Sequence, residues 1–149
     1  MGLGNAFTSI GRGLVAGAAG TVVITAITMA EGKLRGKEDS TAPADAMGKV
    51  LEVEPTSEEG EQKLTNASHW AYGTAWGAAR GVLGSLGLRG APATLVHFAM
   101  VWGSALVMLP SLDIAPPPSQ WGGKELSLDA FRHFAYSASV NLAYEAMED

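Results

Sequence analysis

Residues 13–30, GLVAGAAGTVVITAITMA, form a run of eighteen residues without a charged side chain. A second uncharged run extends over residues 90–112, and its single titratable side chain is His97. An α-helix needs roughly 20 apolar residues to cross the hydrocarbon core of a bilayer. The two runs therefore predict membrane-spanning helices, and they decide the fold class that the rest of the chain must fit.

The charged residues are concentrated between these two runs. The chain of 149 residues has a formal net charge of −5, and residues 31–63 contain five of its ten basic and nine of its fifteen acidic side chains. The acidic balance and the lack of a basic stripe exclude a nucleic-acid partner. The absence of cysteine excludes disulfides, thiol catalysis and thiolate metal sites.

Two further segments, about residues 64–88 and 126–147, complete an all-α four-helix transmembrane bundle in a single domain, residues 1–149. Their apolar runs are shorter and are interrupted by charged side chains, so we expect their polar sides to face the bundle interior. Between the first two spans lies a polar loop, residues 31–63, which carries a short amphipathic helix; Thr56 with Glu59 is a candidate capping box for the helix that follows. The four expected spans are about residues 7–30, 64–88, 91–112 and 126–147.

Glycines recur at a spacing of four in the first two spans. This small-xxx-small pattern allows close approach of helices in a membrane. The pattern predicts helix packing inside the chain or against another membrane protein, and the sequence leaves both open. The candidate packing glycines are Gly13, Gly17, Gly20, Gly73, Gly77 and Gly81.

Histidines and tyrosines mark one end of the predicted bundle. If the spans alternate in direction, the end of the first span and the starts of the second and fourth lie on the same side. A histidine and a tyrosine three residues apart share a helix face, so two such faces are expected to form a polar layer. The candidate layer consists of Glu31, His69, Tyr72, His133 and Tyr136.

These residues do not predict a metal site or a catalytic site. His69, His133 and Glu31 have the chemistry of zinc or iron ligands, but they lack the helical spacing of a paired site. No nucleophile elbow or phosphate-binding loop is present in the sequence. We therefore predict no catalytic residue, no metal, no cofactor and no enzymatic activity.

Several short motifs in the helices resemble one group of membrane proteins. The motifs are His69-Trp-Ala-Tyr-Gly-Thr-Ala-Trp-Gly77, Trp102-Gly103, Pro110 before a proline-rich loop, and His133-Phe-Ala-Tyr136. Together they resemble the YagU-like small bacterial membrane proteins. The resemblance implies a four-span protein of the bacterial inner membrane, in a group loosely linked to acid tolerance, and it transfers no catalytic residue. The excess of basic residues near the ends of the loop predicts that residues 31–63 face the cytoplasm.

Three functions remain open from the sequence. The glycine rows favour a non-enzymatic accessory or assembly subunit whose partners are membrane lipids and other integral membrane proteins. The polar layer suggests a small proton- or ion-conducting protein as an alternative. Trp70, Trp76 and Trp102 beside the glycine face suggest a module that binds a lipid, quinone or pigment. A soluble helical bundle is a further interpretation, because the second and fourth helices are only moderately apolar.

Overall fold

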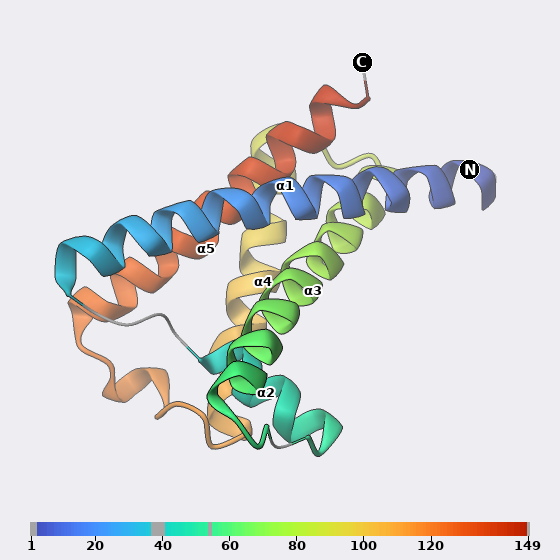
Figure 1. Cartoon of the computed structure of the whole chain (residues 1–149). Helices are drawn as coiled ribbons and strands as arrows, with labels where there is room; N and C mark the ends of the chain where they lie inside the picture. Colours follow the sequence, from blue (N-terminus) through green and yellow to red (C-terminus); the bar gives the residue numbers. More distant parts are fainter. Residues whose placement is uncertain (1–2, 37–40, 54, 149) are drawn as a thin grey trace.

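The computed structural model describes residues 3–36, 41–53 and 55–148, and these residues form helices and connecting loops without a strand (Figure 1). The all-α fold class is confirmed. The short helix predicted in the polar loop is present as α2. The elements in chain order are α1 (Leu3–Arg35), α2 (Ala42–Leu51), α3 (Glu58–Ser85), α4 (Gly90–Ser111), a 3-10 turn η1 (Pro118–Gln120) and α5 (Gly123–Ala146).

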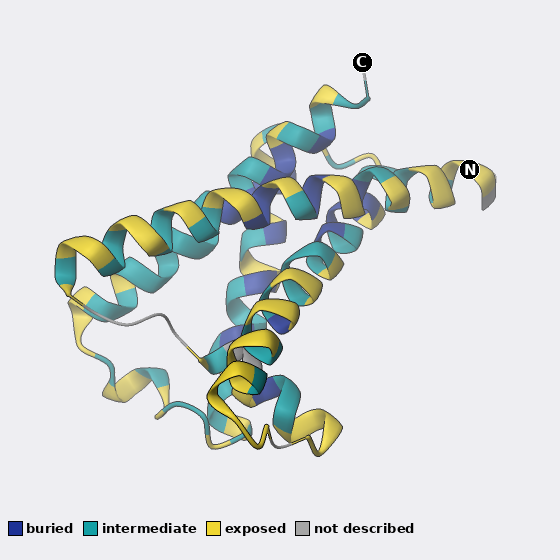
Figure 2. Cartoon of the chain, viewed as in Figure 1, coloured by how far each residue is buried: buried dark blue, intermediate teal, exposed yellow. Residues whose placement is uncertain are grey.

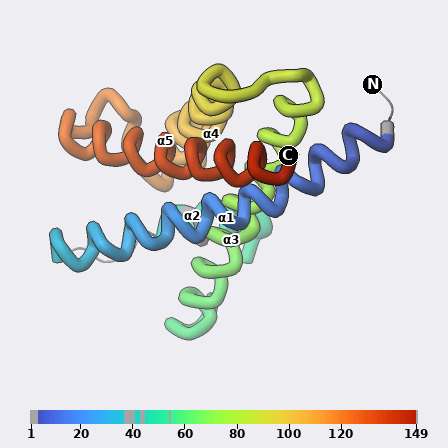
Figure 3. Tube along the Cα trace, turned by 90° about the horizontal axis from the view of Figure 1, so that it is seen from above, coloured from blue at the N-terminus to red at the C-terminus, as the bar shows by residue number. Residues whose placement is uncertain are grey.

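The long helices are not arranged as a parallel bundle. Helices α1 and α5 run side by side in opposite directions, and α3 crosses α1 (Figure 1). Figure 3 shows α4 almost end-on where α1 is seen lengthwise, so the axes of α1 and α4 cross steeply. Spanning helices usually tilt by 0–40° from the membrane normal. The arrangement therefore does not confirm the predicted four-span bundle.

Two helices of the described chain are long and apolar enough to cross a membrane, namely α1 from Gly4 and α4. Only 28% of the most apolar window of α1 and 22% of that of α4 are buried within the protein. Charged side chains such as Arg80 and Arg132 interrupt α3 and α5. Figure 2 shows the buried residues gathered where the helices cross and exposed residues along their outer turns.

Glycines bring α1 and α3 into backbone contact at their crossing. A Cβ atom added to Gly17 would lie 2.6 Å from the carbonyl oxygen of Thr74, and one added to Gly77 would lie 2.6 Å from Cα of Gly17. Gly13 lies against Gly77 and Gly81 in the same way. The glycine rows of α1 and α3 are therefore used for packing inside the chain.

Helix α5 packs beside this crossing through aromatic and small residues. Gly20 of α1 faces Tyr136 and Val140 of α5, and Gly84 of α3 faces Tyr144. Tyr136, Val140 and Tyr144 belong with Ala16 to the buried apolar core. The core is small, and it lies at the place where the polar side chains described below are also buried.

The start of α3 differs from the sequence expectation. Ser57, not Thr56, is the N-cap, and its hydroxyl accepts a hydrogen bond of 3.1 Å from the backbone N–H of Gly60. Glu58, Glu59 and Glu61 occupy the first turn, where negative charge interacts favourably with the helix dipole. The N-cap therefore lies one residue after the predicted Thr56, and because the third helical position is Gly60 the predicted capping box with Glu59 does not form.

Candidate functional site

A cluster of polar side chains is buried where α3, α4 and α5 meet. Arg80 of α3, His97 of α4 and Tyr144 of α5 have no exposed surface, and Asn141 is 4% exposed. Buried polar groups cost free energy unless they are hydrogen-bonded. The contacts of this cluster therefore determine both its stability and its chemistry.

Arg80 is the charged centre of the cluster. Its Nε donates a hydrogen bond of 2.8 Å to Oδ1 of Asn141, and its guanidinium carbon lies 4.0 Å from the ring centroid of Tyr144. The nearest carboxylate oxygen, Oε1 of Glu145, lies 3.6 Å from Nη2. That oxygen also accepts a 2.5 Å hydrogen bond from the backbone N–H of Gly90. Arg80 thereby connects α3 to α5, and Glu145 connects α5 to the start of α4.

His97 of α4 belongs to the same cluster, where it contacts α3 and α5. Its Nε2 lies 3.0 Å from the carbonyl oxygen of Trp76, and its ring centroid lies 5.8 Å from that of Tyr136. A carbonyl oxygen only accepts hydrogen bonds, so Nε2 carries the hydrogen in this contact. In neutral His97, Nδ1 is consequently an acceptor. Tyr136 donates its hydroxyl hydrogen to the carbonyl oxygen of Gly73.

Several buried atoms of the cluster have no hydrogen-bond partner among the described residues. They are Nη1 and Nη2 of Arg80, Nδ1 of His97, the hydroxyl of Tyr144 and the hydroxyl of Ser137. An unsatisfied buried polar group costs about 1–3 kcal/mol, and a charged one costs more. The burial of these groups therefore has a free-energy cost that the surrounding packing must offset.

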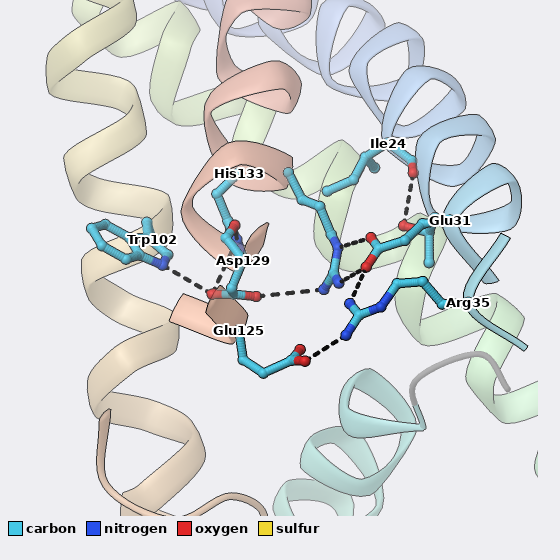
Figure 4. A network of polar contacts seen from close by, with 9 residues as sticks. Ile24, Glu31, Arg35, Trp102, Glu125, Asp129 and His133 are labelled. Atoms are coloured by element: carbon cyan, nitrogen blue, oxygen red, sulfur yellow. Dashed lines mark hydrogen bonds and ion pairs between the residues drawn. The ribbon is translucent and has the colours of Figure 1, made fainter. Parts of the chain in front are cut away.

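A second polar network joins the end of α1 to the start of α5 (Figure 4). Glu31 accepts two hydrogen bonds of 2.8 Å from Nε and Nη2 of Arg132 and one of 2.5 Å from Arg35. Arg35 also donates to Glu125 at 2.5 Å. Glu31 follows the uncharged run 13–30, and the two guanidinium groups balance its negative charge. This network fixes the ends of two antiparallel helices against each other.

Asp129 extends this network to α4. Its Oδ2 accepts a hydrogen bond of 2.9 Å from Nε1 of Trp102, and its backbone oxygen accepts one of 2.8 Å from Nδ1 of His133 (Figure 4). The indole of Trp102 also stacks on Phe98, with ring centroids 5.3 Å apart. Asp129 and Trp102 therefore tie α5 to α4, while Glu31 and Arg132 tie it to α1.

The predicted polar layer is distributed over separate contacts. His69 lies 2.9 Å from the hydroxyl of Thr25, and the Tyr72 hydroxyl lies 3.4 Å from that of Ser104. The other three candidates bind elsewhere: Glu31 to arginines, His133 to the backbone of Asp129, and Tyr136 to the backbone of Gly73. The N-terminal ends of α3 and α5 lie apart in Figures 1 and 3. Each of the five residues therefore has a hydrogen-bond partner outside the predicted layer.

The glycine face of α3 does not form an open cleft with the tryptophans. Backbone atoms of α1 lie directly on Gly77 and Gly81, and Thr21 lies on Gly73. The lipid, quinone or pigment site that the sequence suggested on this face is therefore filled by α1. In the described residues, no three histidine, aspartate or glutamate side chains are grouped to hold a metal ion.

Sequence reasoning gave too little weight to Arg80, His97 and Asn141. The structure places Arg80 beside Glu145 and buries Asn141 against Arg80. The missing signal is a polar stripe on α5 at spacings of three and four, in which successive members lie on adjacent helical turns. This stripe consists of Asp129, Arg132, His133, Tyr136, Ser137, Asn141, Tyr144 and Glu145.

Comparison with protein-family models, with curated proteins and with solved structures finds no match to this chain. The resemblance to YagU-like proteins is therefore not tested by these comparisons. Arguments about function must come from the helices and the buried polar clusters themselves.

Proposed function

We propose that the protein is a non-enzymatic integral membrane protein that serves as an accessory or assembly subunit of a larger membrane complex. The observation that carries this proposal is the low burial of the two most apolar helices. A core helix of a soluble protein is mostly buried, whereas only 28% and 22% of the apolar windows of α1 and α4 are buried. Exposed apolar side chains, among them Val15 and Val22 of α1 and Leu95 and Val107 of α4, suit contact with lipid.

The lengths of α1 and α4 support different tilts in the membrane. The 33 residues of α1 give a helix of about 50 Å, while the 22 residues of α4 give about 33 Å. The hydrocarbon core is about 30 Å thick, so a longer helix is accommodated by tilting. A strongly tilted α1 beside a more upright α4 agrees with their steep crossing.

We propose a multi-pass protein of the bacterial inner membrane with residues 31–63 in the cytoplasm.

Cysteine labelling tests this topology without a background, because the natural chain has no cysteine. Glu52→Cys lies in the polar loop, and Arg89→Cys lies beyond the opposite end of α3; both positions are exposed. A membrane-impermeant thiol reagent added to intact spheroplasts is expected to label position 89 and not position 52. Equal labelling of both positions would mean that α3 does not cross the membrane. A protein removed from membranes by carbonate would contradict membrane integration altogether.

The outer side of α4 is the surface that we propose for a transmembrane helix of another protein. On this side of α4, small and apolar side chains recur every four residues and form one row. Space beside the row is open, because no atom of the described residues lies within 4 Å of a Cβ added to Gly103. Small residues in an open row favour close approach of a second helix in lipid. The row consists of Ala91, Leu95, Ala99, Gly103 and Val107.

Enlarging Gly103 tests the accessory role directly. We expect the wild-type protein, extracted from its native membrane in mild detergent, to migrate in an assembly larger than its 15.4 kDa chain. Gly103→Ile is expected to abolish this co-migration and to keep the circular dichroism spectrum, because the position is open inside the chain. Size-exclusion chromatography with mass spectrometry measures the co-migration, and circular dichroism measures the helix content of the variant. A wild-type monomer without partners would refute the proposal.

Ion conduction ranks below this function for two reasons. The five residues proposed for its polar layer hydrogen-bond to partners outside that layer, and Arg80 places a fixed positive charge inside the bundle. A buried arginine opposes the passage of protons and other cations. The observations therefore favour a structural role for the polar clusters over a proton path.

A further inference from the structure

Helix α2 exposes its larger apolar side chains instead of burying them. On the side toward the protein, Ala46 is buried, while Gly48 and Lys49 line a cavity shared with α3. The backbone N–H of Val53 donates a hydrogen bond of 2.9 Å to the carbonyl oxygen of Gly48, which holds Val53 at the end of the helix. The large apolar side chains exposed on this segment are Val50, Leu51 and Val53, with exposed fractions of 64%, 58% and 47%. Exposed apolar groups with polar neighbours mark an interaction surface.

The position of α2 is fixed at the end of α4. The ammonium group of Lys49 donates a hydrogen bond to the carbonyl oxygen of Leu112, the C-cap of α4, and lies 3.5 Å from that of Asp113. Figure 1 shows α2 at the end of the molecule where α4 ends. Because α4 is about 33 Å long and the hydrocarbon core is about 30 Å thick, this end of a spanning α4 reaches the boundary between acyl chains and headgroups. With α4 in the membrane, α2 therefore lies at the depth of the interface.

We propose that α2 lies in the membrane interface and inserts Val50, Leu51 and Val53 among the acyl chains of phospholipids. Amphipathic helices in an interface bury their apolar side by about 5–10 Å. The contact is apolar and not ionic, because acidic side chains outnumber basic ones in α2 and the first turn of α3. This inference rests on the proposed membrane integration, and it adds a lipid anchor in the polar loop that the spanning helices do not provide.

Nitroxide labels on single cysteines measure this contact with the full chain in vesicles of phosphatidylcholine. Oxygen concentrates in lipid and a nickel chelate stays in water, so the ratio of their collision rates with a label reports the surroundings of that label. Labels at Leu51→Cys and at Met100→Cys, an exposed position of α4, are expected to collide mainly with oxygen. A label at Glu58→Cys, exposed in the first turn of α3, is expected to collide mainly with the nickel chelate.

The two oxygen-accessible labels separate this inference from the proposed function. A Leu51 label in water beside a Met100 label in lipid would overturn the inference and keep the membrane integration of the protein. A Met100 label in water would refute both. A Leu51 label that collides with neither reagent would mean that protein covers α2, which also overturns the inference.

Removing the apolar side chains tests whether they hold α2 in the lipid. With a label at Val53→Cys as the reporter, the combined change Val50→Ser and Leu51→Ser is expected to reverse the collision ratio in favour of the nickel chelate, because burial of apolar surface no longer favours the lipid. The combined change Val82→Ser and Leu86→Ser, at exposed positions near the other end of α3, is the matched control and should leave the Val53 label in lipid. An unchanged ratio in the α2 variant would contradict the apolar contact. Entry of the label into lipid only when the vesicles contain phosphatidylglycerol would contradict it as well.

Discussion

Replacing Gly77 by alanine is expected to lower the free energy of unfolding by about 1–3 kcal/mol, since overpacking a close-packed contact has costs in this range. The added methyl group would meet the backbone of Gly13 and would lie 2.6 Å from Cα of Gly17. These are backbone atoms, so no side-chain rotation can make room. The helices α1 and α3 must move apart along their whole crossing. Thermal or denaturant-induced unfolding in a fixed detergent, followed by circular dichroism, measures the effect.

Gly103→Ala is the matched control for this substitution. It also places a methyl group on a helical glycine, but nothing among the described residues lies within 4 Å of the new atom. Alanine is favoured over glycine in a helix interior by about 0.5–1 kcal/mol. The control is therefore expected to unfold at the wild-type midpoint or slightly above it. An unchanged midpoint for Gly77→Ala would contradict the close crossing of α1 and α3.

The helices themselves could be predicted because their signals are local. The uncharged runs 13–30 and 90–112 lie inside α1 and almost entirely inside α4, and the short helix expected in the polar loop is α2, in which Met47, Val50 and Leu51 have helical spacing. Glycines four residues apart indicate close packing, because they remove side chains from one face. Each of these features depends on residues within a few helical turns, which a sequence displays directly.

The partner of each helix face could not be predicted in the same way. Gly13 and Gly20 are both packing candidates on α1, yet Gly13 faces α3 and Gly20 faces α5. The choice depends on the rotation and crossing of whole helices. The polar layer stays a prediction: it assumed parallel spans with aligned ends, whereas α3 and α5 diverge at their N-terminal ends (Figures 1 and 3). His69 and His133 consequently bind Thr25 and the Asp129 backbone.

The polar stripe of α5 was expected to face the bundle interior, but the sequence did not identify the residues that it meets there. Charged and polar residues on a helix usually indicate a solvent-exposed face, and the sequence alone does not distinguish that case from a buried polar seam. In the structure, Tyr136, Ser137 and Asn141 are buried because three other helices contact α5. A weakly apolar helix that is rich in serine and tyrosine is therefore compatible with an interior position. Its partners, Arg80 and His97, lie 61 and 44 residues earlier than Asn141 and cannot be assigned from local spacing.

Replacing Asn141 by leucine is expected to lower the free energy of unfolding by about 1.5–3 kcal/mol, the range for hydrogen bonds to charged groups. The change removes the acceptor that lies 2.8 Å from Nε of Arg80 and leaves that buried nitrogen without a partner in the described chain. Asn66→Leu, on the exposed side of α3, is the control for the same chemical change. It is expected to leave the unfolding midpoint within the small range of surface substitutions.

A double variant distinguishes a lost hydrogen bond from a badly fitted leucine. When Arg80→Met is combined with Asn141→Leu, both the buried charge and its acceptor are absent, and replacing both partners by apolar groups is often nearly neutral. The double variant is therefore expected to be more stable than the sum of the two single changes predicts. Strict additivity in the double-mutant cycle would mean that Arg80 and Asn141 are not coupled. A coupled pair would mean that the hydrogen bond between Arg80 and Asn141 stabilises the packing of α3 on α5, in addition to the glycine contacts that join α1 to α3.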